Sequence, residues 1–180
     1  MRITVSGLPG SGTTSLSRYL EKQTGFSMIS AGEVFRQLAK EHGMDLATFG
    51  HLAKEDPAYD RMIDARQKKI AEERDNIIIE GRLSGWMVEN ADLKIWLYAP
   101  IGCRIKRIAF RDQVSDEETA KALTLERELC EAGRYQSYYS IDISDLSIYH
   151  LIINSEHWDV EGLGLIVDTA LTHLKPSAGC

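Results

Sequence analysis

Short apolar runs alternate along the chain with longer stretches in which apolar residues recur at helical spacing. The short runs predict strands at 2–6, 26–30, 76–81, 93–99 and 147–155. The stretches between them predict helices at 13–23, within 31–73, after the fourth strand as far as about residue 111, and at 159–174. The third run is apolar without alternation, as expected when helices cover both faces of a parallel sheet. The pattern therefore predicts an α/β fold with a five-stranded parallel sheet, flanking helices and right-handed crossovers.

Two segments contribute no strand and are predicted to be insertions. Residues 31–73 have a helical pattern that is broken near Gly43 and at Asp56–Pro57. Residues 112–145 are polar and charged, which fits either a mobile helical excursion or a solvated face. We therefore expect a single domain over 1–180, with two insertions at 31–73 and 112–145 and a core made of 1–30, 74–111 and 146–180.

Charge and cysteine content exclude several classes of protein. The formal net charge of -6 argues against a general binder of nucleic acid or of a membrane surface, because both partners are anionic. The odd number of cysteines and the absence of a C-x-x-C pair predict a reducing compartment without a disulfide framework. No apolar run is long enough for a signal peptide or a spanning helix. We therefore expect a cytoplasmic protein.

The stretch GLPGSGTT at 7–14, between the first strand and the first helix, has the G-x-x-x-x-G spacing of a phosphate-binding loop. Glycines let the backbone curl so that N–H groups point at an anion, and the helix adds its free N–H groups and positive dipole end. A plain glycine-rich turn is the alternative. Thr14 is placed for its hydroxyl to reach a Mg²⁺ ion that bridges the phosphates. The lysine expected before it is absent, and Thr13 stands there instead.

A lysine at that position would place a cation at the transferring phosphoryl group, so a kinase lacking it needs other cations there. Arg107 and Arg111 are spaced i, i+4 and share one helix face, although a solvated face gives the same spacing. Arg127 and Arg134 lie in the polar insertion, and arginine suits bidentate binding of phosphate. These four arginines predict a mobile flap that closes over a triphosphate and excludes water.

Other charged residues follow strands at the predicted carboxyl edge of the sheet, where ligands bind in open α/β folds. Arg36 lies in the helix after the second strand, and Arg82 lies in a glycine-flanked turn directly after the third. Glu80 ends the third strand, where it can hold Mg²⁺ through a water molecule or, alternatively, cap the next turn. Arg36 and Arg82 together favour a phosphorylated acceptor.

Seven stretches carry a more specific pattern: GLPGSGTT, ISAGEVFR, EDPAYDRMIDARQ, IIIEGRLSGWM, ADLKIWLYAP, ERELCEAGRYQSYYSIDI and LIINS. Together they resemble the archaeal-type cytidylate kinases, a group of P-loop nucleoside monophosphate kinases. The resemblance runs from Arg2 to about Ser155 with its spacing intact. It implies a P-loop nucleoside monophosphate kinase fold with helical acceptor-binding (31–73) and lid (112–145) insertions. It also implies transfer of the γ-phosphoryl group of ATP, with Mg²⁺, to CMP or dCMP, giving ADP and CDP or dCDP.

The resemblance further implies roles for individual residues. ATP would be held by an adenine-binding turn at Asn154 and by the loop residues Gly7, Leu8, Pro9, Gly10, Ser11, Gly12, Thr13 and Thr14. The acceptor phosphate would be bound by Arg36 and Arg82, and the transferring phosphates would be lined by the lid arginines Arg107, Arg111, Arg127 and Arg134. Polar candidates for contacts with the base are Asp60, Asp64, Arg66 and Gln67. The first two share a helix face, which a salt-bridged solvated helix would also show.

Two other functions fit part of this pattern. A nucleotide-binding regulator that lost catalysis with its lysine would keep the loop, but it would need no acceptor arginines. A kinase for AMP, UMP or a sugar would share the fold, and Arg36 with Arg82 argues against a plain sugar. The identity of the base stays open. We expect a monomer whose partners are ATP and CMP or dCMP rather than nucleic acid or a membrane.

Overall fold

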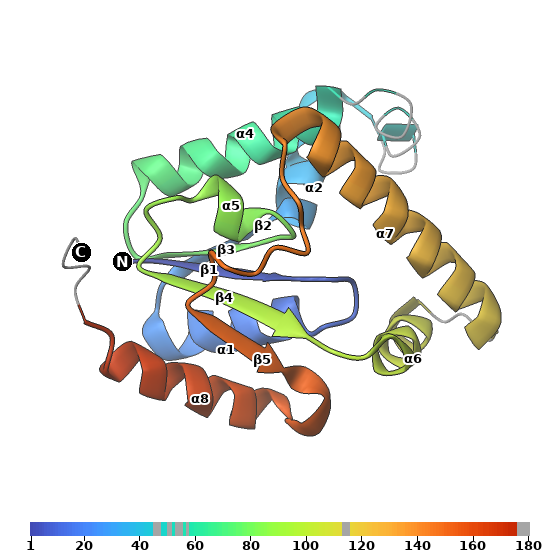
Figure 1. Ribbon diagram of the computed structural model, residues 1–180. Helices are drawn as coiled ribbons and strands as arrows, with labels where there is room; N and C mark the ends of the chain where they lie inside the picture. Colours follow the sequence, from blue (N-terminus) through green and yellow to red (C-terminus); the bar gives the residue numbers. More distant parts are fainter. Residues whose placement is uncertain (45–47, 50–51, 53–55, 57, 113–115, 176–180) are drawn as a thin grey trace.

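Five parallel strands form one sheet in the order β2-β3-β1-β4-β5 in the computed structural model (Figure 1). The structure describes all residues except 45–47, 50–51, 53–55, 57, 113–115 and 176–180. The strands are β1 (Arg2–Gly7), β2 (Ser27–Ser30), β3 (Ile77–Glu80), β4 (Leu93–Tyr98) and β5 (Leu151–Asn154). Because β3 and β4 pair with opposite sides of β1, the chain changes direction at the central strand. In such sheets the ligand site lies at the carboxyl ends of the strands beside this point.

Helices cover both faces of the sheet (Figure 1). One face is covered by α1 (Thr13–Thr24) and α8 (Val160–Thr172), and the other by α2 (Ala31–Glu41), α4 (Ala58–Glu73) and the short α5 (Ser84–Met87). Beyond the carboxyl ends of the strands lie α6 (Ile101–Asp112) and α7 (Glu117–Tyr139). The long helix α7 runs from α6 toward α2 and α4, so it spans the edge of the sheet where the site is expected.

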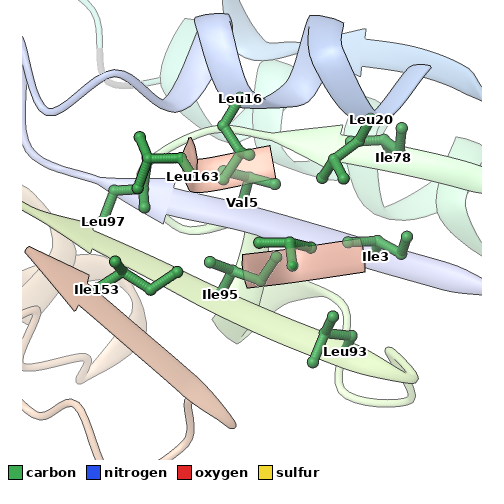
Figure 2. Packing of buried hydrophobic residues seen from close by; sticks show 11 residues of the cluster. Ile3, Val5, Leu16, Leu20, Ile78, Leu93, Ile95, Leu97, Ile153 and Leu163 are labelled. Atoms are coloured by element: carbon green, nitrogen blue, oxygen red, sulfur yellow. The ribbon is translucent and has the colours of Figure 1, made fainter. Parts of the chain in front are cut away.

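The hydrophobic core is divided between the two faces because strand side chains alternate. Ile3 and Val5 of β1 point toward α1 and pack with Leu16 and Leu20 (Figure 2). In β3, Ile78 joins this cluster, while Ile77 and Ile79 belong to the cluster beneath α2 and α4. The apolar run of the third strand thus serves both faces, as its sequence predicted.

The helix α7 is attached differently from the helices that cover the sheet. Near its start, Ala120 packs against Ile105 and Ala109 of α6. Further along, two of its glutamates, Glu128 and Glu131, pair with arginines, and Tyr139 at its end bonds to Asp64 of α4. Asp116 begins the helix by accepting bonds from two backbone N–H groups, as N-terminal caps do. Within the described part of 112–145, the main element is therefore the capped helix α7, and its mobility stays a prediction.

The predicted α/β fold, with its five-stranded parallel sheet, is confirmed, but one strand was predicted too long. Residues 147–150 precede β5 rather than belonging to it, because the backbone N–H of Tyr149 bonds to the carbonyl of Leu146 in a turn. The predicted break at Pro57 and the last residues of the chain lie outside the described residues. Among the helices that the structure describes, none combines the length and the apolar character needed to cross a membrane.

Candidate active site

The loop between β1 and α1 is curled as phosphate binding requires. Gly10 and Gly12 adopt left-handed backbone conformations, with φ values of 79° and 97°. A Cβ atom at Gly10 would also lie 2.7 Å from the carbonyl oxygen of Arg104, so glycine is required there on two grounds. The loop leads directly into α1, whose first N–H groups have no partner within the helix. These features build an anion site at the end of the central strand.

The carbonyl groups of this loop are held by donors from outside it. Ser155 donates its hydroxyl to the Ser11 carbonyl at 2.7 Å, and Arg107 donates to the Gly10 carbonyl at 3.3 Å. Arg107 also binds the hydroxyl and carbonyl oxygens of Ser155, at 3.0 and 2.8 Å. Arg107 therefore joins the loop to the turn after β5, which begins beside Asn154. Its predicted contact with the transferring phosphates stays a prediction.

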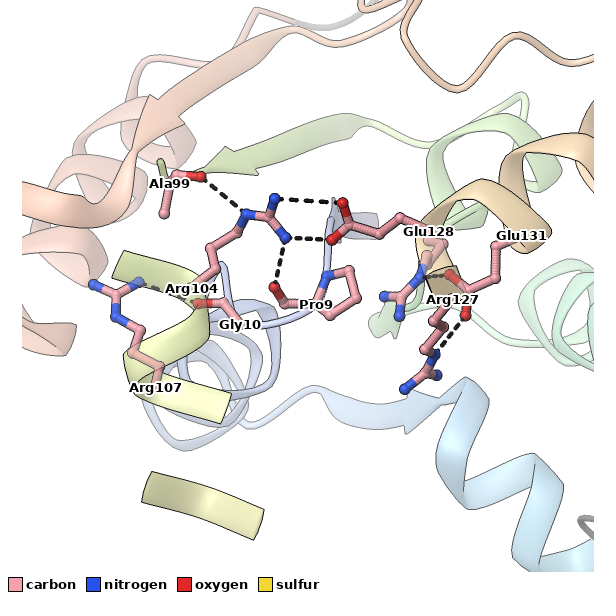
Figure 3. Close-up of polar contacts among 9 residues, drawn as sticks. Pro9, Gly10, Ala99, Arg104, Arg107, Arg127, Glu128 and Glu131 are labelled. Carbon is pink, nitrogen blue, oxygen red and sulfur yellow. Dashed lines mark hydrogen bonds and ion pairs between the residues drawn. The ribbon is translucent and has the colours of Figure 1, made fainter. Parts of the chain in front are cut away.

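Arg104 holds the loop from a position that the sequence interpretation missed. Its side chain is buried, and it donates from Nε to the Ala99 carbonyl at 3.0 Å and from Nη1 to the Pro9 carbonyl at 3.1 Å (Figure 3). It also forms an ion pair with Glu128 of α7. The spacing of residues 104, 107 and 111 on one helix face was the signal that could have revealed it.

Thr13 and Thr14 both contact Glu80 at the end of β3. The Thr13 hydroxyl donates to Glu80 Oε1 at 2.7 Å, and the Thr14 hydroxyl does so at 3.3 Å. The residue in the lysine position is thus bound to a carboxylate and brings no cation. A hydroxyl beside a carboxylate is a set of hard oxygen ligands, so Thr14 and Glu80 fit a Mg²⁺ ion that keeps water ligands.

Glu131 of α7 brings Arg82 and Arg127 together. It forms an ion pair with Arg82, and its Oε1 accepts a 2.8 Å bond from Nε of Arg127 (Figure 3). Burial alone would raise the pKa of Glu131, but the charges and hydrogen bonds of the two arginines outweigh it and hold this pKa below its ordinary value. The carboxylate is therefore ionised at neutral pH. No sequence signal indicates this contact, because Glu131 is one of many acids in a polar helix.

The candidates for reading the base lie on α4, and several have partners within the protein. Gln67 is buried and donates to the Glu80 carbonyl at 3.0 Å. Asp64 accepts a 2.8 Å bond from the Tyr139 hydroxyl at the end of α7. Arg66 forms a 2.5 Å ion pair with Glu41 of α2. Asp60 lies in α4, but its side chain is outside the described part of the structure.

The remaining predicted residues lie on three helices and at the end of β5. Arg36 is exposed on α2, and Arg111 is exposed near the end of α6. Arg134 is half-buried on α7, two turns beyond Arg127. The side chain of Asn154 ends β5 by accepting a 3.0 Å bond from the N–H of Glu156. Among the predicted arginines, Arg82 and Arg127 are thus brought together through Glu131.

A glycine-rich phosphate loop at the centre of a five-stranded parallel sheet, with helices on both faces, defines the class of P-loop kinases. The fold is similar to that of shikimate kinase from Bacteroides thetaiotaomicron, with a TM-score of 0.66, 14% identity, and coverage of 96% of this chain and 98% of that chain. Residues 2–157 match the model of the cytidylate kinase-like family, and the chain belongs to that family.

The chain is also similar, over nearly its whole length, to proteins named cytidylate kinase. The chain is 76% identical to the cytidylate kinase of Methanoregula boonei, over 97% of this chain and 96% of the relative. It is 65% identical to the cytidylate kinase of Methanosphaerula palustris, over 97% of this chain and 99% of the relative. The predicted resemblance and the predicted enzyme class, an ATP-dependent nucleoside monophosphate kinase, are thereby confirmed.

Proposed function

We propose that the protein is a cytidylate kinase that transfers the γ-phosphoryl group of ATP to CMP or dCMP, giving ADP and CDP or dCDP. The observation that carries this proposal is the convergence of Arg82, from the core, and Arg127, from α7, on one carboxylate. This carboxylate, Glu131, lies one helical turn beyond Glu128, which pairs with Arg104 at the phosphate loop. Arg82 would lie on the acceptor side, and Arg127 belongs to the segment that we assign as the lid. The relatives named cytidylate kinase support CMP as the acceptor.

On the donor side, the loop Gly7–Thr14 and the start of α1 would bind the phosphates of ATP through backbone N–H groups. The adenine would lie at the turn after Asn154, which Arg107 and Ser155 join to the loop. Thr14, with Glu80 through water, would hold Mg²⁺, which neutralises phosphate charge when bound. Thr13 brings no cation, so the positive charge missing there would come from the lid arginines.

On the acceptor side, Arg36 and Arg82 would bind the phosphate of CMP. This phosphate is already ionised, so its attacking oxygen needs no general base and the protein must chiefly position it and stabilise charge. That charge would be stabilised by the lid arginines Arg107, Arg111, Arg127 and Arg134. Asp60, Asp64 and Gln67 are the candidates for contacts with the polar edge of cytosine. A base that left these groups unpaired would be rejected strongly. Segments 31–73 and 112–145 would act as the acceptor-binding insertion and the lid of a single domain.

The test is ADP formation from ATP and Mg²⁺ with CMP, dCMP, UMP, AMP and shikimate as separate acceptors. Turnover confined to CMP and dCMP is expected. Arg82→Ala should raise KM for CMP, whereas Arg18→Ala, at an exposed position on α1, should leave it unchanged. Preferred turnover of AMP or UMP would reassign the acceptor. ATP binding without turnover on any acceptor would favour a regulator instead.

A further inference from the structure

Glu131 lies between two arginines to which the proposed function assigns phosphates. Its carboxylate accepts a bond from Nε of Arg82, and Oε1 accepts another from Nε of Arg127. Arg82 follows β3 in the core, whereas Arg127 precedes Glu131 by one turn of α7. A single carboxylate therefore joins the arginine expected at the acceptor phosphate to an arginine of the lid helix.

Both arginines make this contact through Nε. Within the part of the chain that the structure describes, no hydrogen bond engages the terminal nitrogens of Arg82 or Arg127. A guanidinium group carries five N–H donors in a rigid plane, and its two terminal nitrogens can bind a phosphate as a pair. A bond to Nε fixes the orientation of that plane and leaves the terminal donors for a ligand.

The burial and charge of the cluster formed by Glu131, Arg82 and Arg127 also fit an orienting role for Glu131. The side chain of Glu131 is only 9% exposed, that of Arg82 is 18% exposed and that of Arg127 is 60% exposed. An ionised carboxylate at such a site reduces the repulsion between the two guanidinium groups before any phosphate arrives. The cluster keeps one net positive charge, and its more exposed member is the arginine of α7.

We propose that Glu131 is a positioning residue that aligns Arg82 and Arg127 with the two phosphates between which transfer occurs. This inference rests on the proposed function, because it takes the acceptor phosphate as the ligand of Arg82. Glu131 touches neither nucleotide and acts through the arginines, as supporting residues orient the ligands of other sites. A carboxylate that competed with phosphate for the arginines would have the opposite effect, since its removal would strengthen CMP binding.

Glu131→Gln tests this directly, because it keeps the size of the side chain and one acceptor oxygen but removes the charge. We expect kcat/KM for CMP to fall by about tenfold or more, and the Kd of CMP measured by calorimetry without ATP to rise. Glu126→Gln, at an exposed position on the same helix, is the matched control and should leave both values unchanged. Unchanged values in Glu131→Gln, or tighter CMP binding, would overturn the proposal.

A double-mutant cycle separates positioning from a general structural effect. In the Arg82→Ala background, Glu131→Gln should weaken CMP binding little further, because the arginine through which it acts is gone. Fully additive losses would overturn the proposal. If Glu131→Gln does not fold, Glu131→Asp serves in its place, because it keeps the charge but shortens the reach of the side chain. Wild-type CMP binding by Glu131→Asp would also overturn the proposal. If the wild-type protein binds and phosphorylates no nucleoside monophosphate, the proposed function itself fails, whereas normal wild-type activity with an unaffected Glu131→Gln refutes only the positioning role.

Discussion

Thr13 donates a 2.7 Å hydrogen bond to Glu80 at the position where a phosphate-binding loop ordinarily carries lysine. The same carboxylate oxygen accepts a longer bond from Thr14, so one acid receives both hydroxyls at the start of α1. Thr13 therefore holds an acid at this position and supplies no positive charge. The orientation of Glu80, which we assign to Mg²⁺ through water, depends on this contact.

The first prediction concerns Thr13→Val, which preserves the shape of the side chain but removes its hydroxyl. We expect kcat to fall by about threefold to tenfold, because Glu80 loses its shorter hydrogen bond and is less well fixed. The Mg²⁺ concentration that gives half-maximal rate should rise, while KM for CMP stays the same. Steady-state ADP formation at varied Mg²⁺ measures these quantities.

Thr172→Val is the control for this change, since that hydroxyl also makes one hydrogen bond from a helix, to the carbonyl of Asp168. It should leave kcat and the Mg²⁺ dependence at wild-type values. An unchanged Mg²⁺ dependence in Thr13→Val would show that the hydroxyl does not act through Glu80.

The second prediction concerns Arg104, which joins the phosphate loop to α7. Arg104→Ala leaves Glu128 without its partner and removes the donor to the Pro9 carbonyl. Breaking a buried ion pair on one side costs about 3–5 kcal/mol, so we expect a loss of this order in the free energy of unfolding. KM for ATP should also rise, because the loop loses a support. Urea denaturation and ATP kinetics measure the two effects.

Arg104→Ala combined with Glu128→Ala should recover part of that stability, since no unpaired carboxylate remains. Arg18→Ala, at an exposed position on α1, serves as the control and should change the free energy of unfolding little. If Arg104→Ala is as stable as Arg18→Ala, the ion pair with Glu128 does not support the fold.

The sheet and the phosphate loop were predictable because their signals are local. Apolar runs, the glycine spacing and the final Thr14 lie within a few residues of one another. The fifth strand was overestimated because Tyr149 is buried, yet it packs against Trp96 and does not extend the strand. An apolar run indicates burial, and the sequence pattern of residues buried in a turn resembles that of residues buried in a strand.

The supporting contacts of the site could not be predicted from the sequence. Arg104 and Glu128, or Arg82 and Glu131, meet only because α7 lies across the carboxyl edge of the sheet. The helix has little apolar periodicity, so its sequence does not indicate which side faces the core. Acids that pair with arginines across such a distance in sequence look the same as acids that face water.

The third prediction concerns Gly164, which lies in α8 against the ring of Tyr19. Replacing glycine by alanine inside a helix usually stabilises it by up to about 1 kcal/mol. Here a Cβ atom would overlap the Tyr19 ring, so Gly164→Ala should instead destabilise the protein by about 1–3 kcal/mol. Gly102→Ala, in α6, meets nothing within 4 Å and should be neutral or stabilising. Thermal unfolding compares the two, and equal effects would contradict the predicted overlap.

The last prediction concerns Tyr149, whose burial raises the pKa of its hydroxyl to about 12, although the nearby Ser6 hydroxyl opposes this shift. A tyrosine in the unfolded chain ionises near a pKa of about 10. Between these values the unfolded state releases a proton that the folded state keeps, so raising the pH favours unfolding. The stability due to the neutral hydroxyl is therefore complete below about pH 10 and is lost as the pH approaches about 12.

Tyr149→Phe removes this titration and keeps the ring that packs against Trp96. Between pH 9 and pH 11, we expect the free energy of unfolding of the wild type to fall by about 1.3 kcal/mol more than that of Tyr149→Phe. Urea denaturation at both pH values measures the difference. Tyr98→Phe, at an exposed position on β4, should follow the wild type. If the wild type and Tyr149→Phe lose stability in parallel, the hydroxyl of Tyr149 ionises as readily in the folded protein as in water, and its burial does not raise its pKa.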